Sequence, residues 1–237
     1  MHNKLKILIE IIAIVGSVLL SFYIENLRKN NNDLILKNIL IDDLIVTIDD
    51  DLIQINNILN VLLESEKSII ELQNDIDKSH FLISDLDAIQ KLTGIEFAVS
   101  FFHKDGIYNE LISTGSFQLI ENKDLKKNLL EIYNHLKDRN NVISRAVDDF
   151  YTDFFVRVNS EFRIRFSYNS FDGDYYGSKI LTNFDFNKEY YLSNSFYGLL
   201  SQALQYVKMY SRLLKDIEKS YKTVYSLSKK EKSLSQE

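Results

Sequence analysis

The sequence predicts an all-α protein: an N-terminal transmembrane helix followed by an elongated antiparallel helical bundle with one irregular aromatic loop or short hairpin. The 237 residues include no Pro and only 7 Gly, so the residues that end helices are nearly missing. A long apolar run lies close to the N-terminus. Apolar residues also recur at steps of three and four in the first and last thirds of the chain, which indicates long amphipathic helices. We therefore expect an anchor in residues 1–29 and a bundle domain in residues 30–237.

The anchor is predicted from the stretch IEIIAIVGSVLLSFYIENLRK. Ile11 to Ile24 is mostly apolar, but at about 1.5 Å per residue it extends only about 21 Å, less than the hydrocarbon core of about 30 Å. A helix that begins at Leu5 reaches about 30 Å and leaves Glu10 about one turn inside the interface. This predicts an uncleaved single-pass signal anchor in the cell inner membrane. The alternatives are a cleaved signal peptide, an amphipathic helix in the membrane plane and a buried core helix.

Glu10 lies on one narrow face of this helix. The face also holds Ala13, Ser17 and Ser21, at steps of three, four and four residues. Small and polar residues of this kind allow helices to approach closely in lipid, so we expect the face to contact another helix. Two other interpretations stay open. Glu10 is either a titrating group of an ion- or proton-coupled membrane assembly, or an acid that simply reaches the interface.

Two long amphipathic helices are expected in the bundle domain. The first extends from Leu34 to about Ile76, and its buried side is predicted at Ile41, Ile45, Ile48, Leu52, Ile55, Leu59 and Leu62. The second begins at a cap on Ser193 or Asn194, and its buried side is predicted at Leu200, Ala203, Val207, Tyr210, Leu214, Ile217, Tyr221 and Val224. We expect these two helices to pack against each other.

Shorter elements fill the middle of the chain. A helix is predicted from Gly106 to Ser113, ended by Gly115, and a long helix is predicted to begin near Asn122. Residues 162–191 mix aromatic residues with Asp, Asn and Gly and lack a helical period. This insert is expected to be an exposed, irregular loop or a short hairpin between two bundle helices.

Two stretches carry a recognisable pattern. The first is the acid-containing apolar stretch quoted above, which runs into an Asn- and Arg-rich helix. The second is IYNELISTGSFQLIENKDLKKNLLEIYNHL, whose Tyr-x-x-Leu, Ser-x-Gly, Leu-Ile-x-Asn, Leu and Tyr pattern is carried by Tyr108, Leu111, Ser113, Gly115, Leu119, Ile120, Asn122, Leu125 and Tyr133. Together they resemble a family of short, uncharacterised single-span membrane proteins of the Bacteroidota that carry a domain of unknown function. The resemblance implies a cytoplasmic N-terminus and an extracytoplasmic bundle, and it implies no activity.

Composition and motifs point away from most enzymes. Without Cys, the chain has no disulfide, thiolate metal site or cysteine nucleophile. No phosphate-binding Gly-rich loop or Gly-x-Ser-x-Gly motif occurs. No His ligand pair is found among His2, His80, His103 and His135. We therefore expect neither a metal nor a cofactor, and the net charge of -6 argues against nucleic acid as a partner.

Two kinds of acidic segment require a separate interpretation. Solvated helix surface is predicted for the acids Asp49, Asp50, Asp51, Asp148, Asp149 and Asp153. The stretch FDGDYYG is either a calcium- or sugar-binding loop around Asp172 and Asp174, or a turn that uses Gly173 and Gly177.

These observations predict a function of binding rather than catalysis. We expect a membrane-anchored, non-enzymatic binding, scaffold or sensor module. Its partner is expected to be a protein or a second copy of the chain, engaged through the anchor and the long helices. An enzyme with a site outside the recognised motifs is the remaining alternative.

Overall fold

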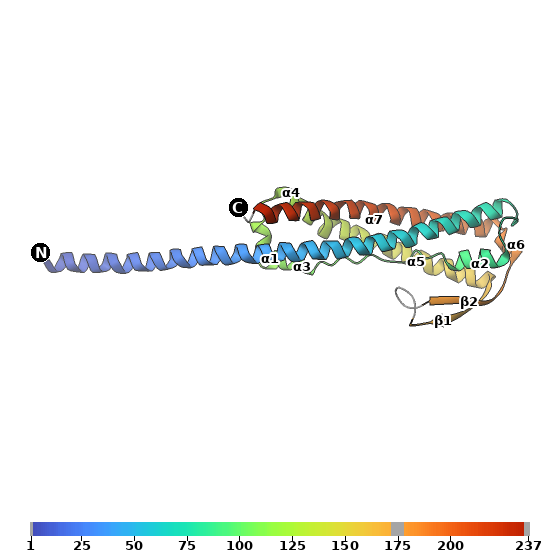
Figure 1. The fold of residues 1–237 in the computed structure, drawn as a ribbon, viewed down its shortest axis with the longest axis horizontal. Coiled ribbons are helices and arrows are strands. Elements are labelled where there is room, and N and C mark those ends of the chain that lie inside the picture. Colours follow the sequence, from blue (N-terminus) through green and yellow to red (C-terminus); the bar gives the residue numbers. More distant parts are fainter. Residues whose placement is uncertain (1, 172–177, 235–237) are drawn as a thin grey trace. The chain divides into compact units, whose positions relative to one another are not determined.

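The fold is given by a computed structural model that describes residues 2–171 and 178–234. Its elements, in chain order, are α1 (His2–Asp77), α2 (Asp85–Thr93), α3 (Gly106–Ser113), the 3-10 helix η1 (Ser116–Leu119), α4 (Lys123–Leu130), the π-helical turn η2 (Glu131–Leu136), α5 (Lys137–Glu161), β1 (Arg163–Asn169), β2 (Ser178–Asp185), α6 (Lys188–Tyr191) and α7 (Asn194–Leu234). Helix makes up 79% of the chain, but β1 and β2 form a two-stranded antiparallel sheet (Figure 1). The predicted all-α class is therefore wrong, because the insert at 162–191 contains a regular hairpin.

The predicted transmembrane helix is the second correction. Across residues 2–171 and 178–234, no helix combines the length and the apolar composition that crossing a bilayer requires. α1 has 76 residues, but Glu10 and Glu25 enclose only about 21 Å of uncharged helix, against about 30 Å of hydrocarbon. The predicted signal anchor is therefore wrong. The single-pass inner-membrane location, with a cytoplasmic N-terminus and an extracytoplasmic bundle, is wrong with it.

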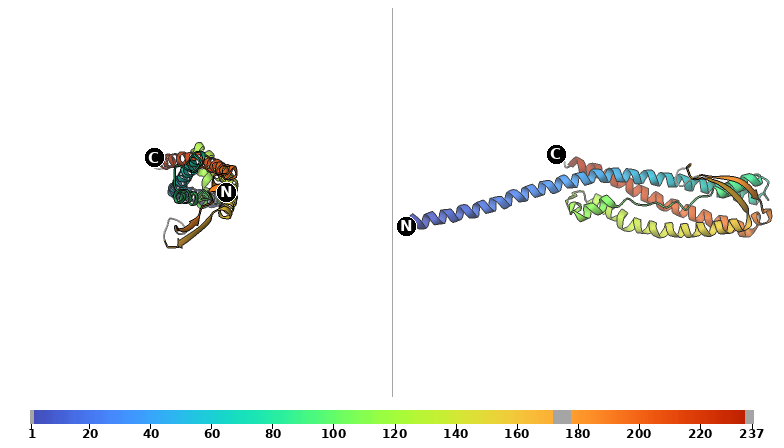
Figure 2. Two further views of the ribbon diagram at one scale, coloured as in Figure 1. Left: turned by 90° about the vertical axis from the view of Figure 1, so that its right-hand side faces the viewer. Right: turned by 90° about the horizontal axis from the view of Figure 1, so that it is seen from below.

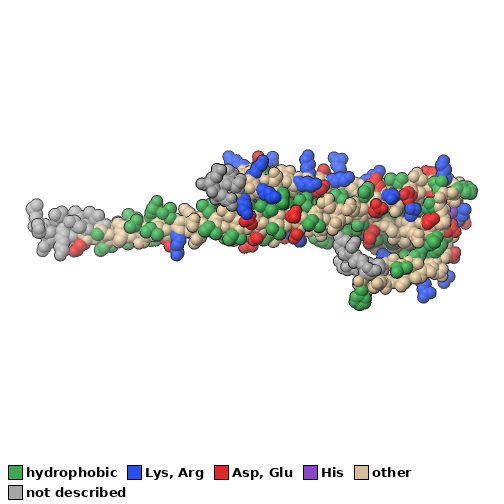
Figure 3. All heavy atoms as spheres, in the orientation of Figure 1, with side chains coloured by type: hydrophobic (Ala, Val, Ile, Leu, Met, Phe, Trp, Pro, Cys, Tyr) green, Lys and Arg blue, Asp and Glu red, His purple; other side chains and the backbone are tan. Residues whose placement is uncertain are grey.

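α1 continues without a break past residues 29 and 30, where the sequence suggested a boundary. Its N-terminal part exposes large apolar side chains along the helix (Figure 3). Leu19 and Phe22 are among them, at 64% and 66% exposure. Further along α1, from Lys37, buried residues recur at steps of three and four, as an amphipathic helix requires.

The chain divides into two compact units, which we describe separately. Unit 1 comprises Met1–Asp49, Lys104–Leu130 and Thr223–Glu237, and unit 2 comprises Asp50–His103 and Glu131–Lys222. In unit 1, the Lys37 ammonium group donates to the Glu231 carboxylate at 3.1 Å, and both side chains are buried. The same carboxylate accepts the backbone N–H groups of Glu121 and Asn122, each at 2.9 Å. One glutamate therefore binds a buried cation and two backbone donors that precede α4.

In unit 2, α1 and α7 run antiparallel. The Tyr221 hydroxyl donates to Asp51 at 2.9 Å, and Gln73 donates to Ser201 at 2.9 Å, so the residue numbers rise along one helix as they fall along the other. Asp51 is fully buried. The solvated position predicted for it is wrong, because it lies on the buried stripe of α1.

The extended segment after α2 covers α5 in the core of unit 2. The Phe97 ring packs against Phe150 and Phe154 of α5, each at 5.9 Å between ring centroids. The Phe101 N–H donates to the Tyr210 hydroxyl at 2.9 Å, which fixes the same segment to α7. Aromatic rings thus connect three elements that are distant in sequence.

Candidate binding site at the base of the hairpin

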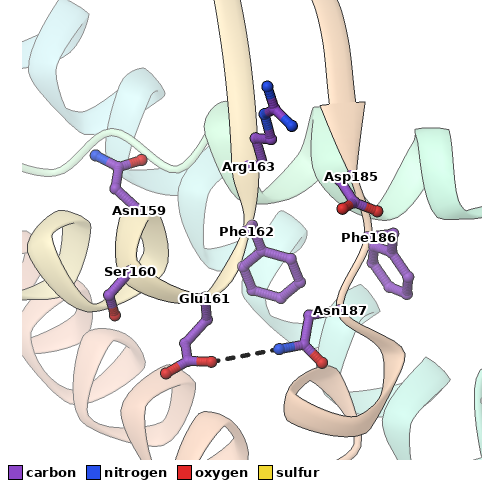
Figure 4. A pocket seen from close by; sticks show the side chains of 8 residues that line it. All are labelled: Asn159, Ser160, Glu161, Phe162, Arg163, Asp185, Phe186 and Asn187. Carbon is purple, nitrogen blue, oxygen red and sulfur yellow. Dashed lines mark hydrogen bonds between the residues drawn. The ribbon is translucent and has the colours of Figure 1, made fainter.

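The candidate site lies where α5 passes into the hairpin and the hairpin passes into α6. α5 ends at Glu161, and Phe162 turns to extended backbone while its N–H still bonds the Val158 carbonyl at 2.9 Å. After β2, the Asn187 side chain accepts the Tyr190 N–H at 3.0 Å and so caps α6. Asn187 also donates to the Glu161 carboxylate at 3.3 Å (Figure 4). A single asparagine therefore ties the two ends of the hairpin together.

A pocket of about 450 Å³ opens at this junction. It is lined by Asn159, Ser160, Glu161, Phe162, Arg163, Asp185, Phe186 and Asn187. Figure 4 shows the rings of Phe162 and Phe186 side by side at the bases of the strands, with their centroids 5.7 Å apart. The pocket lining is mainly polar and carries both charges, and Phe162, one of its two aromatic residues, is itself buried.

An aromatic cluster continues from the pocket into the core of unit 2. Phe196 of α7 packs against Phe162 at 5.6 Å and against Tyr191 at 5.5 Å. All three of these side chains are buried. Phe186 packs against Tyr191 at 5.0 Å. The wall of the pocket is therefore supported by a packed core rather than by a loose loop.

His80 lies on the other side of Phe186. The two rings are stacked, with centroids 5.0 Å apart and an interplanar angle of 26°. His80 Nδ1 lies 2.6 Å from Asp75 Oδ2, and Nε2 lies 2.7 Å from Asp85 Oδ1. The imidazole thus bridges the last turn of α1 and the first residue of α2. Burial lowers the pKa of His80, but the hydrogen bonds and charges of the two carboxylates outweigh it and leave the pKa above its ordinary value.

Asp75 gathers four donors around one buried carboxylate. Besides His80, it accepts the Tyr191 hydroxyl at 2.8 Å and the N–H groups of Leu82 and Ile83 at 2.8 and 3.2 Å. Burial raises the pKa of Asp75, but these hydrogen bonds outweigh it and leave the pKa below its ordinary value. Asp75 is therefore an ionised hub that holds the α1–α2 turn.

The turn itself adopts an unfavourable backbone conformation. Ser79 and His80 have φ angles of 58° and 61°, in the left-handed region. This conformation costs a non-glycine residue roughly 1–2 kcal/mol. Phe81 and Leu82, which follow, are 82% and 60% exposed, so these two side chains do not anchor the turn. The hydrogen bonds to Asp75 and Asp85 hold it, together with the packing of the buried His80 ring on Phe186.

The hairpin projects beside the helices of unit 2 (Figure 2, left). Alternation along β1 places Ile164, Phe166 and Tyr168 on one face. Phe166 lines an apolar groove with Phe155 of α5. Toward the tip the apolar side chains are not covered: Tyr168 and Ile180 are 56% and 59% exposed, and Phe171 is 99% exposed.

The residues predicted from sequence lie elsewhere. Glu10, Ala13, Ser17 and Ser21 are exposed on α1, and the two serine hydroxyls donate within the helix, to the carbonyls of Ile14 and Ser17. The structure places Tyr108, Leu111 and Tyr133 in the core.

Two further residues of the predicted motif lie at helix ends. Gly115 follows α3 with a φ of 77°, and the Asn122 side chain accepts the Asp124 and Leu125 N–H groups at the start of α4. None of the predicted residues lines the pocket.

The predicted calcium- or sugar-binding loop concerns residues that the structure does not describe. The acids and glycines of the FDGDYYG loop, residues 172–177, lie outside the described residues. Elsewhere in the described chain, no three His, Asp or Glu side chains are grouped so that they could hold a metal ion.

Sequence reasoning missed His80, Asp75 and Asp85, although two signals were present. Asp75 follows Leu72 at a step of three and so continues the buried stripe of α1. Ser84 and Asp87 form a capping box that marks the start of α2. Residues 78–84, between the end of α1 and the start of α2, therefore form a tight turn that contains His80.

Comparisons with known proteins give no match: no family model, no curated protein and no solved structure resembles the chain at a significant level. The resemblance to the Bacteroidota family stays a prediction. The geometry at the base of the hairpin is therefore the basis for a functional proposal.

Proposed function

We propose that the protein is a non-enzymatic binding module that holds a protein partner on the β1–β2 hairpin. The observation that supports this most is the exposure of the hairpin. Tyr168, Phe171 and Ile180 are each more than half exposed on an element that projects beside the helices. Burying a large apolar side chain contributes about 1.5–3 kcal/mol, so a partner that covers these three gains several kcal/mol.

The partner we propose is an extended protein segment that adds a strand to the hairpin. The sheet has two strands, so both β1 and β2 are edge strands. Backbone hydrogen bonds along an edge supply affinity, and side-chain pockets beside it supply specificity. The pocket at the hairpin base has the position and mixed polarity to receive a side chain of such a segment.

The pocket lining supports binding rather than chemistry. Ser160 is the only hydroxyl-bearing residue among the eight lining residues. Its Oγ donates to the Arg157 carbonyl at 2.7 Å rather than to a base. Nucleophilic catalysis needs a base within hydrogen-bonding distance of the hydroxyl.

Site-specific photocrosslinking tests the proposal. A photoreactive phenylalanine analogue at Phe171 is expected to give one reproducible protein adduct in the native cell extract. The control is the same analogue at Val142, a residue of α5 that is 71% exposed. In a protein with the analogue at Phe171, Ile180→Lys is expected to abolish the adduct at an unchanged melting temperature, because a charge now faces the partner. Equal adducts at Phe171 and Val142, or an adduct that survives Ile180→Lys, would overturn the proposal.

A further inference from the structure

The contacts of His80 with Asp75 and Asp85 determine the protonation state of its imidazole ring. Each ring nitrogen faces a carboxylate oxygen, Asp75 at 2.6 Å and Asp85 at 2.7 Å. Ionised carboxylates only accept hydrogen bonds, and a neutral imidazole has one N–H to donate. Both contacts are hydrogen bonds only when the ring is an imidazolium with two N–H groups. The geometry therefore describes the protonated state.

Deprotonation of His80 affects Asp75 and Asp85 differently, because only Asp85 is exposed to water. The Asp75 side chain is 0% exposed and the Asp85 side chain is 58% exposed. Water can replace the imidazole at Asp85, but it cannot reach Asp75. A neutral His80 therefore keeps its Nδ1–H on Asp75 and loses the bond from Nε2 to Asp85.

We propose that His80 is a proton-operated clasp that joins the end of α1 to the start of α2 when protonated and releases Asp85 when neutral. The titratable groups that contact the imidazole and its acceptors come from three elements: Asp75 of α1, Asp85 of α2 and Tyr191 of α6. Burial raises the pKa of Tyr191, so this hydroxyl stays neutral and continues to donate to Asp75.

The clasp also acts on the pocket. Phe186 lines the pocket and stacks on His80 at 5.0 Å. An aromatic ring attracts a cation stacked on its face, so loss of the His80 charge weakens this contact. The inference goes beyond partner binding, since it assigns the hairpin base a response to pH whether or not a partner is present.

The direction of the pH response follows from the same contacts. The carboxylates raise the pKa of His80 above 6.5. The clasp therefore contributes its full stability below pH 6.5 and loses it as the pH rises through the folded pKa. We expect the start of α2 to open on the alkaline side.

Nitrogen-15 NMR of the imidazole rings tests the clasp on the full chain. At about pH 6 both His80 ring nitrogens are expected to carry hydrogen, and above the folded pKa only Nδ1 is expected to do so. The protection factor of the Ala88 amide, in the first turn of α2, is expected to fall with the same midpoint once the base-catalysed rise in intrinsic exchange is removed. A neutral ring at pH 6, or retention of hydrogen on Nε2 alone at alkaline pH, would overturn the proposal.

A conservative variant keeps the test independent of folding. Asp85→Asn is expected to lower the midpoint by about one pH unit, because it removes a charge next to the ring. Glu189→Gln, which removes an exposed acid of α6 in the same unit, is the control and is expected to leave the midpoint in place. Equal midpoints in Asp85→Asn and the unmodified protein would also contradict the clasp.

Discussion

Replacing Glu231 with Ala is expected to lower the free energy of unfolding by about 3–5 kcal/mol. The substitution removes the carboxylate that faces the buried Lys37 ammonium group. It also takes the acceptor from the N–H groups of Glu121 and Asn122 just before α4. Burial raises the pKa of Glu231, but these bonds and Lys37 outweigh it and hold the pKa below its ordinary value. This contribution is therefore present above the ordinary pKa and lost as the pH falls through the folded pKa.

Urea unfolding measures the effect, with Asp42→Asn as the matched control. Asp42 accepts from Lys232 at 2.6 Å in the same unit, but both side chains are nearly half exposed. Exposed ion pairs contribute at most about 1 kcal/mol. We also expect Lys37→Met combined with Glu231→Ala to be more stable than Glu231→Ala alone, because the buried charge is gone. A Glu231→Ala protein as stable as the Asp42→Asn protein would contradict the assigned role.

Asp75→Ala is expected to have an effect of similar size, about 3–5 kcal/mol. The variant leaves the buried Tyr191 hydroxyl and two backbone N–H groups without their acceptor, next to a cationic His80. It also releases a turn whose left-handed residues depend on that carboxylate. We expect thermal unfolding to move to a much lower temperature and exchange at the α1–α2 turn to become fast.

The control for Asp75→Ala lies two residues further along the same helix. Asp77 is exposed, and its one described contact is a long bond of 3.4 Å from the Tyr197 hydroxyl. Asp77→Ala is expected to change stability by about 0.5 kcal/mol or less. If the two variants unfold alike, Asp75 is not the hub that its four contacts indicate.

The buried polar residues of the long helices could have been predicted more fully from the sequence. Three polar residues follow one another at steps of two heptads on the apolar stripe of α1: Lys37, Asp51 and Ser65. Each of them is buried and hydrogen-bonded to a partner. The stripe of α7 likewise extends from Val224 to Glu231. A polar residue in the apolar register of a helix indicates a buried interaction, because leaving it unsatisfied is costly. Asp51 lies in this apolar register, which explains why the prediction of a solvated side chain was wrong.

Other features could not be predicted, for physical reasons. The contact between Asp75 and Tyr191 joins residues 116 positions apart, and no local pattern reports it. β1 does alternate polar and apolar residues, which is typical of a strand, but β2 does not, and the register of the pair shifts between Arg165 and Phe166. The apolar run near the N-terminus suggested a membrane span, but its composition falls short of one. Helix content followed from local propensity, whereas the site depends on how distant elements meet.

Phe186 connects the pocket to the His80 clasp, so its environment is the most direct measurement of whether the hairpin base is one proton-responsive site. We propose fluorine-19 NMR of the protein with 4-fluorophenylalanine at Phe186, titrated from about pH 5 to 9 beside the same protein carrying His80→Gln. The resonance is expected to shift with the midpoint of the His80 ring and to stay in place in the His80→Gln protein. A resonance that does not move, or that moves equally in both proteins, would contradict this coupling.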